Sequence, residues 1–553
     1  MRSIAPAFIP RSRVLFVLVS LFGFATTMVG GEVAWSKVTT DDFVAYSDAS
    51  QNDVAEFLVQ YTAYRQVFRK MFGAPDHRLP PATLMLFRRT ADFQDHGPRR
   101  DSTTELRSFS VGVDGRVLLS LSVGGDRAEA LRLAIEFETT WGLRRCGYYV
   151  PLWMSQGTGK VLSTLQVRNG KVRVGRATEG IDYWFYDRSE ELPWPHFFAV
   201  TADSPDYKGA TQAAGTYHSQ AWALMHWVLL DDAAGAARFA GLAARLRTQL
   251  GQEAIESVMN TDVRKFSEAI RRHLKGSRKV QEFDFDEAGA RSRLKFASAP
   301  PAEVAVLKAE LLAASGRSES AQQLLYARQV EPDLPVVKEA WARKATRENN
   351  PDEATRLYRE AIECGSTNYM AYLNSASARL DDSAAGGADY AGGGGRGTTK
   401  AIEEIKTAMT ISSGDRWTYQ LLGRAYYVSP TITEENVKEL DAGVTLGEDG
   451  EAVRYYRGLL WLRLDRVDEF KADLEQVIAD PETTTWFRTA AKRHLAYQAY
   501  SSGEKRVQDA LTEGKVEEAQ KILVALDALD LDRNTAQRYR HLRATVESAA
   551  KKK

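Results

Sequence analysis

Cysteine is almost absent from this chain of 553 residues, which contains only Cys146 and Cys364. The two cysteines lie far apart in the sequence and in different predicted domains. A framework of disulfides therefore cannot be the source of stability. We expect two buried thiols in a fold that is stabilised by the burial of apolar side chains.

The chain also lacks an excess of charge of either sign. Lys and Arg total 73, and Asp and Glu total 73, so the formal net charge is +0 at pH 7. Nucleic acid and anionic membrane surfaces attract proteins with excess positive charge, so neither is an expected partner. The composition, with 44% hydrophobic and 10% aromatic residues, is that of an ordinary globular protein.

Long apolar runs are scarce as well, and the clearest one extends from residue 14 to residue 30. Arg2, Arg11 and Arg13 precede it. A basic start, a short apolar segment and then small residues are typical of a secretory signal. We therefore expect residues 1–31 to be the signal peptide of an exported protein, periplasmic or extracellular. An uncleaved membrane anchor is the alternative, although the run is slightly short for a bilayer span.

Three zones follow the predicted signal. Residues 38–275 mix strand and helix patterns, residues 276–300 have the composition of a polar linker, and residues 301–548 are almost continuously helical. A Gly-rich stretch at 383–399 interrupts the helical zone. A phosphate-binding Gly-rich loop needs a preceding strand, which is missing from the pattern here, so we expect a flexible loop.

Periodicity predicts the elements of the first zone. Alternating apolar residues predict strands, a spacing of three to four residues predicts amphipathic helices, and Asp-Gly or Asn-Gly between apolar runs predicts hairpins. The predicted elements are strands at 43–46 and 83–87, hairpins turning at 114–115 and 169–170, and helices at 54–72, 126–141, 151–165, 217–230, 233–250 and 262–274.

The helical zone contains internal repetition. Ala321 and Leu325 recur as Ala354 and Tyr358, at a separation of 33 residues. The segment Tyr419-x-x-Leu422-Gly423-x-x-Tyr426 resembles the signature of tetratricopeptide repeats. This resemblance implies helix pairs that stack into a solenoid with a concave groove for a protein or peptide. A spacer that only holds the first domain at a distance is the alternative.

The segment 131–164 contains two motifs on successive predicted helices, Ile-Glu-Phe-Glu-Thr at 135–139 and Pro-Leu-Trp-Met-Ser-Gln-Gly at 151–157. Together they resemble the core of gluzincin-type metallopeptidases, specifically the peptidase-MA-like domains. That family carries His-Glu-x-x-His and then Pro-x-Trp-Leu-x-Glu-Gly. The resemblance implies two His and one Glu as zinc ligands, and the Glu of the first motif as general base.

The match fails at every metal ligand. Glu136 keeps the general-base position, but the three ligand positions hold Ile135, Thr139 and Gln156. Ile cannot bind zinc, and Thr and Gln are poor ligands beside imidazole and carboxylate. The eight histidines contain no pair spaced by four residues that would rebuild the site. We therefore expect no metal and no cofactor.

Three hypotheses concern the old active site. Lys160 or Arg132 replaces part of the metal's charge and neutralises Glu136 or Glu138. The strand at 117–123 is an edge that pairs with an extended peptide. The aromatic cluster Tyr183, Trp184, Phe185 and Tyr186 lines the cleft with Trp194, Phe197 and Phe198, unless these residues are simply core.

The predicted fold is an α+β gluzincin-like domain followed by an all-α tetratricopeptide solenoid. The predicted function is that of a pseudopeptidase that binds or scaffolds a protein or peptide in the cell envelope, mainly through the solenoid. The alternative is an active hydrolase or metallopeptidase that uses Glu136 with unrecognised metal ligands.

Overall fold

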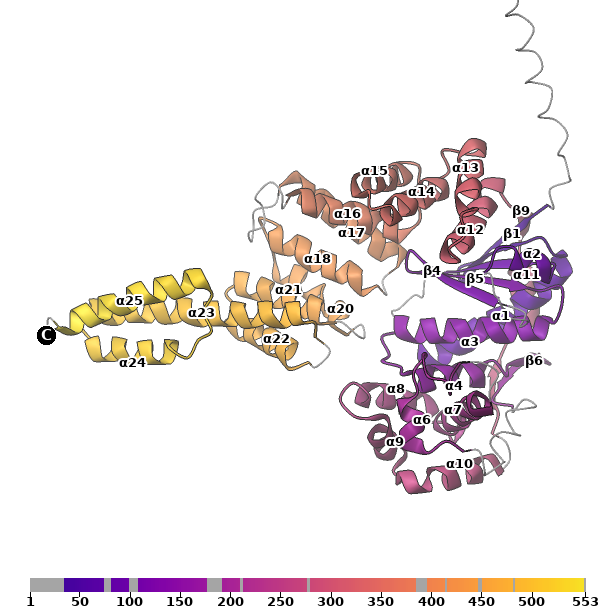
Figure 1. Ribbon diagram of the computed structural model, residues 1–553, viewed down its shortest axis with the longest axis horizontal. Coiled ribbons are helices and arrows are strands. Elements are labelled where there is room, and N and C mark those ends of the chain that lie inside the picture. Colours follow the sequence, from indigo (N-terminus) through magenta and orange to yellow (C-terminus); the bar gives the residue numbers. More distant parts are fainter. Residues whose placement is uncertain are drawn as a thin grey trace, which may run out of the picture.

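The computed structural model describes residues 34–73, 81–98, 108–176, 191–208, 212–275, 279–383, 395–412, 415–445, 450–480 and 483–551. Its N-terminal part is mixed α/β, and a mostly helical region extends away from it (Figure 1). The predicted signal peptide lies outside the described residues. Within the described segments, no helix combines the length and the apolar character that crossing a membrane requires.

A six-stranded mixed sheet forms the centre of the N-terminal part, in the order β4-β5-β3-β2-β1-β9. β2, β3 and β5 are parallel neighbours, and the remaining pairs are antiparallel. The strands predicted at 43–46 and 83–87 are confirmed as β2 and β3. The strands are β1 (Ser36–Thr39), β2 (Phe43–Ser47), β3 (Ala82–Phe87), β4 (Ser108–Val113), β5 (Arg116–Ser122) and β9 (Phe296–Ser298).

The hairpin predicted at Asp114-Gly115 joins β4 to β5. Asp114 has a φ of 50° and Gly115 a φ of 65°, the pair of left-handed residues that a two-residue turn between twisted strands requires. The hairpin also corrects one hypothesis. Because β4 pairs with β5 on its outer side, the strand at 117–123 lies inside the sheet and is not a free edge.

Two long helices cover one face of the sheet, α1 (Gln51–Phe72) and α3 (Arg127–Arg145). Each begins at a side-chain cap, because Ser50 accepts from the backbone N–H of Asp53 and Asp126 from that of Glu129. Buried aromatic and aliphatic residues of α1 pack on the sheet and on α3. The sequence pattern predicted both helices.

A smaller group of elements lies beyond α3. The elements are α4 (Leu152–Leu162), α6 (Trp194–Ala199), α7 (Gln212–Leu230), α8 (Gly235–Arg245), α9 (Gly251–Met259), α10 (Phe266–Lys275), β6 (Gln166–Arg168) and β7 (Lys171–Val174). Gly157 allows α4 to touch α7, since a Cβ there would lie 2.2 Å from the carbonyl oxygen of Ala221. On the other side of α4, a Cβ at Gly159 would lie 3.1 Å from Glu136 Cα of α3.

The polar segment 276–300, expected to be a linker, is instead part of the N-terminal fold. Residues 276–278 lie outside the described residues, but β8 (Gln281–Asp284) pairs with β7, and β9 pairs with β1 at the edge of the main sheet. Between them, α11 (Glu287–Arg293) is capped by Asp286. Short edge strands need few apolar residues, so their composition resembled that of a loop.

The C-terminal region consists of successive antiparallel helices (Figure 1). The predicted Gly-rich stretch 383–399 mostly lies outside the described residues, but its last residues belong to α17. The helices are α12 (Pro301–Ala314), α13 (Ser320–Val330), α14 (Pro335–Arg347), α15 (Pro351–Glu363), α16 (Tyr369–Ser383), α17 (Arg396–Ile411), α18 (Arg416–Val428), α19 (Glu434–Lys438), α20 (Asp441–Thr445), α21 (Gly450–Arg463), α22 (Val467–Ala479), α23 (Thr485–Thr512), α24 (Val516–Leu526) and α25 (Arg533–Lys551).

The pattern of buried residues in α13 is repeated in α15, with a spacing one residue longer than the 33 read from the sequence. The sequence pairing was wrong for α13, because Ala321 and Leu325 are exposed, with Leu325 at 50%. The buried residues that correspond are Ser320, Leu324 and Ala327 in α13, and Ala354, Tyr358 and Ala361 in α15. The corrected spacing equals the usual length of a tetratricopeptide repeat.

The two parts share a core. α12 packs on the sheet face opposite α1 and α3, so the sheet lies between the two sets of helices (Figure 1). Leu311 of α12 is fully buried in one apolar cluster with Met85 and Leu118 of the sheet. The N-terminal part is therefore not an independent unit on a flexible tether.

The two thiols differ from the expectation of two buried residues. Cys146 is half-buried at the end of α3, and burial raises its pKa to about 11. Cys364 is exposed after α15. The first thiol is therefore a weak nucleophile, and the second is open to solvent.

Candidate functional site

The retained motif carboxylate, Glu136, is bound by two cations. Arg132, one turn earlier on α3, approaches Glu136 Oε1 with its Nη1 at 2.5 Å. Lys160 of α4 places its Nζ 3.5 Å from Glu136 Oε2, and Ser163 Oγ lies 3.4 Å from Oε1. The Glu136 side chain is only 15% exposed. The structure thus brings both proposed cations to Glu136, and neither of them pairs with Glu138.

The three positions that the motif resemblance assigns to zinc ligands do not offer zinc donors. Ile135 is fully buried in the core, and Thr139 is fully buried with its hydroxyl 3.2 Å from the Tyr64 hydroxyl. Gln156 is half-buried on α4. A zinc ion needs three protein donors that converge on one point, and an alkyl group and an engaged hydroxyl do not supply them. These residues therefore do not fit the metal that the motif implies.

Glu138 has its own partners, which were not among the pairs proposed from the sequence. It accepts hydrogen bonds from Arg65 and Tyr61 of α1, in a site where all three side chains are buried. Burial, then the charge of Glu138, holds the pKa of Tyr61 well above its ordinary value. The one sequence signal was a charged residue within the apolar face of the helix at 54–72. This buried ion pair ties α1 to α3.

A cleft of about 1290 Å³ opens beside Glu136. Its walls come from α1, α3, the end of α4, β6 and the start of α7, and they include Arg132, Lys160 and His218. Burial, with help from the Lys160 and Arg132 charges, lowers the pKa of His218 to about 4, so this imidazole is neutral near pH 7. A neutral His beside a paired carboxylate can hydrogen-bond a ligand.

In comparisons with models of known families and with curated proteins, the chain matched none. Within the described residues, no group of three or more His, Cys, Asp or Glu side chains is arranged to hold a metal ion.

Part of the aromatic cluster belongs to the core and not to the cleft. Trp194 and Phe197 are buried, and Phe198 packs edge-on against Trp153 of α4 at a ring distance of 5.2 Å. None of these residues lines the cleft beside Glu136. Tyr183, Trp184, Phe185 and Tyr186 lie outside the described residues.

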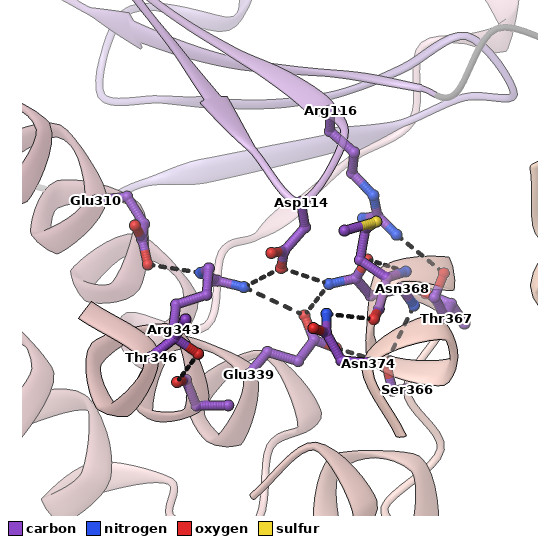
Figure 2. Close-up of polar contacts among 12 residues, drawn as sticks. Asp114, Arg116, Glu310, Glu339, Arg343, Thr346, Ser366, Thr367, Asn368 and Asn374 are labelled. Carbon is purple, nitrogen blue, oxygen red and sulfur yellow. Dashed lines mark hydrogen bonds and ion pairs between the residues drawn. The ribbon is translucent and has the colours of Figure 1, made fainter. Parts of the chain in front are cut away.

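A second polar site lies where the β4–β5 hairpin meets the helical region (Figure 2). Asp114 at the hairpin tip forms an ion pair with Arg343 of α14, and Asn368 Nδ2 donates to Asp114 Oδ2 at 2.8 Å. Arg343 also donates from Nε to Glu310 Oε1 of α12 at 2.9 Å. The neighbouring Glu339 accepts from Asn368 at 3.0 Å. We call this network the junction network.

A further set of polar contacts joins the end of α3 to the helical region. Arg145 Nη1 lies 2.7 Å from Asp415 Oδ2, and the Tyr369 hydroxyl donates to the same oxygen at 2.8 Å. Gly115 packs against this group so closely that a Cβ there would lie 1.6 Å from the Tyr369 hydroxyl oxygen. Three helices of the array contact the hairpin: α12 packs on apolar residues of β4, α14 pairs with Asp114 through Arg343, and α16 meets Gly115 through Tyr369.

Proposed function

We propose that this chain is an exported pseudopeptidase: a gluzincin-like domain without zinc chemistry, joined to a tetratricopeptide-type array, that binds or scaffolds a protein or peptide in the cell envelope. The observation that carries the proposal is the double ion pair of Glu136. A general base must be free to take a proton from water, whereas both carboxylate oxygens of Glu136 are already occupied, Oε1 by Arg132 and Oε2 by Lys160.

The array supplies the binding surface in this proposal. The β4–β5 hairpin covers part of the first helices of the array. We therefore expect a partner to bind the later helices. There, Trp486 and Tyr497 of α23 are 62% and 45% exposed. They lie three turns apart on one face of the helix, and large aromatic residues of this kind dominate many protein interfaces.

Restoring the ligands tests the loss of zinc. The variant Ile135→His, Thr139→His, Gln156→Glu is expected to gain zinc affinity over the natural protein, because all three positions that the motif resemblance assigns to zinc ligands then carry donors. Zinc is measured by metal analysis after dialysis, with Leu325→His, an exposed site on α13, as control. Equal zinc content in the triple variant and the control would contradict the proposed relationship to metallopeptidases.

The competing function is a hydrolase that uses Glu136. Glu136→Gln keeps the hydrogen-bonding shape but removes the charge. Under our proposal, this variant shows the same background rate on peptide and ester substrates as the natural protein. A hydrolytic activity of the natural protein that disappears in Glu136→Gln would support the enzyme instead.

A further inference from the structure

The cleft beside Glu136 is larger than a typical small-molecule site. Its volume of about 1290 Å³ exceeds the roughly 300–1,000 Å³ that is usual for pockets of single small ligands. Its lining follows α3 from Asp126 to Glu136, which is about 15 Å of helix. β6, Arg176 and part of α11 supply other parts of the lining. A cleft of this length can hold a segment of extended chain.

Three arginines that line this cleft have no partner. Arg168 ends β6, Arg176 follows β7, and Arg291 belongs to α11. All three are exposed, and within the described part of the chain none of them forms an ion pair or a side-chain hydrogen bond. Because these guanidiniums are open to solvent, a ligand that enters the cleft can reach them.

Most acids of the cleft already have a partner within the chain. These acids are Glu56, Asp126, Glu129 and Glu136. Asp126 caps α3, and the other three form ion pairs with arginines. Glu287 is the remaining acid of the lining. The unpaired arginines therefore outnumber the unpaired acids, and the cleft favours a ligand with negative charge.

His218 of α7 adds a hydrogen-bond donor at the Glu136 end of the cleft. Its ring packs on Tyr207 and Tyr217, at centroid distances of 5.4 and 5.6 Å. Its Nδ1 is sealed from solvent without a hydrogen-bond partner, and a buried N–H without an acceptor is rarer than a bare acceptor nitrogen. The proton of the neutral ring is therefore on Nε2, which is not sealed. An acceptor in the cleft can bind this N–H.

The cations are spread along the cleft. The Gly175 N–H donates to Thr164 Oγ1 at 2.8 Å, so Arg176 lies near the start of β6, whereas Arg168 ends that strand. The four residues from Thr164 to Arg168 span up to about 13 Å. An extended peptide with an acid at every second residue carries carboxylates about 7 Å apart along one side. Such a ligand matches the spread of the arginines better than one small anion does.

We propose that the cleft binds an extended acidic peptide segment, with carboxylates on Arg168, Arg176 and Arg291 and a further carboxylate on His218 and Lys160. Lys160 Nζ has three donors, of which one contacts Glu136 Oε2 at 3.5 Å. This inference rests on the proposed function and deepens it. It names the chemistry of the peptide partner and gives that partner a surface besides the array.

Two amide side chains favour a peptide over other polyanions. Gln60 of α1 and Gln166 of β6 line the cleft, and neither side chain forms a hydrogen bond within the described residues. Each amide can both donate and accept. A peptide backbone offers both kinds of partner, whereas a polyphosphate offers acceptors only. The lining therefore suits a peptide.

The test is calorimetric titration of the purified chain from residue 32 onward with an acetylated and amidated octapeptide of alternating Glu and Thr. A dissociation constant of about 1 mM or tighter is expected at low salt. Added salt is expected to weaken binding, because exposed ion pairs are screened. The same peptide with Gln in place of Glu is not expected to bind. Mass spectrometry of the titrated sample shows whether the peptide stays intact.

The first variant removes all three free cations: Arg168→Gln, Arg176→Gln, Arg291→Gln. Since all three side chains are exposed, the fold is expected to persist, with unchanged circular dichroism. Binding is expected to weaken at least about tenfold, because three ion pairs with the peptide are lost.

A matched control removes the same charge elsewhere: Arg245→Gln, Arg272→Gln, Arg293→Gln. These arginines are exposed, form no ion pair within the described residues and do not line the cleft. Arg293 lies on α11, as Arg291 does. The control is expected to bind the peptide within about twofold of the natural protein, because the screened charges lie outside the cleft.

A further variant tests the donor of His218. His218→Phe keeps a ring against the two tyrosines and removes the Nε2 N–H. It is expected to weaken binding at least about threefold, because a hydrogen bond to a charged group is lost.

The outcomes separate this inference from the proposed function. Cleavage of the octapeptide during titration would contradict the proposed function. An intact peptide that does not bind, or that binds the triple variant as tightly as the natural protein, would overturn the cleft inference alone. Equal weakening in the control variant would reduce the effect to net charge and overturn it too. Inorganic tetraphosphate that binds as tightly as the peptide would show a site for anions in general, which also contradicts a peptide site.

Discussion

At the scale of single residues, some side-chain partners of Glu136 and Glu138 could be predicted from the sequence and others could not. The sequence predicted that Glu136 had lost its metal, and it proposed Arg132 and Lys160 as replacements because both follow from helical spacing. It did not predict the Arg65–Glu138 pair, because the two residues lie on helices whose packing no local pattern encodes. Partners within one helix or on adjacent helices could be predicted, and distant partners could not.

Two histidines with a lowered pKa, the buried His226 and the half-buried His218, make stability depend on pH. Burial, assisted by the nearby His273, lowers the pKa of His226 to about 4, and the pKa of His218 is lowered to about 4 as well. A histidine in the unfolded chain titrates near pH 6.5. Between about pH 6.5 and 4, the unfolded chain therefore binds protons at these positions, whereas the folded chain does not. The contribution of these histidines to the free energy of unfolding is therefore retained above about pH 7. It is lost as the pH falls towards 4, by roughly 3 kcal/mol for each residue.

The His226→Gln variant tests this dependence. Gln can donate to the Gly175 carbonyl and accept from His273, as His226 does at 2.8 Å to each, but it does not titrate. Asp231 and Lys279 on the far side of His273 stay unchanged. Urea unfolding between pH 7.5 and 5 is expected to show a shallower loss than in the natural protein. An equally steep loss, matching the exposed control His541→Gln, would contradict the assignment.

At the scale of elements, both predicted hairpins formed where their turn residues were placed. Asp114-Gly115 and Asn169-Gly170 all have positive φ, so the turn chemistry was sufficient for prediction. The predictions of the two long capped helices, α1 and α3, were also correct. The order of strands was not predictable, because β5 pairs in parallel with β3 and β9 pairs with the distant β1, and no local pattern encodes either pairing.

The two hairpins provide a matched pair of variants. Gly115→Ala is strained by its φ and collides with Tyr369, whereas Gly170→Ala has nearly the same φ and only one neighbour, the Phe285 carbonyl oxygen at 3.8 Å. Both variants lose about 1 kcal/mol for the left-handed backbone. Gly115→Ala is expected to lose at least about 2 kcal/mol more in urea unfolding, by overpacking. Equal losses would mean that the hairpin tip does not dock against Tyr369.

At the scale of the whole molecule, the sequence divided the chain correctly into a mixed part and a helical part but misjudged how they are joined. The segment at 276–300 was expected to separate them, yet β8 and β9 return to the N-terminal sheets, and α12 covers the open sheet face. The periodicity of apolar residues identifies the apolar face of a helix or strand, but it does not identify the element that packs on that face. A core shared between two parts of the chain therefore cannot be predicted from periodicity.

The central claim is that the N-terminal part has no zinc-dependent activity, and metal content with peptidase activity tests it most directly. The purified chain from residue 32 onward is assayed after dialysis with and without zinc, and with and without a chelator. Our account predicts no stoichiometric zinc and no chelator-sensitive cleavage, because Ile135 and Thr139 are buried and Glu136 is held by two cations. One tightly bound zinc together with cleavage that a chelator abolishes would contradict it.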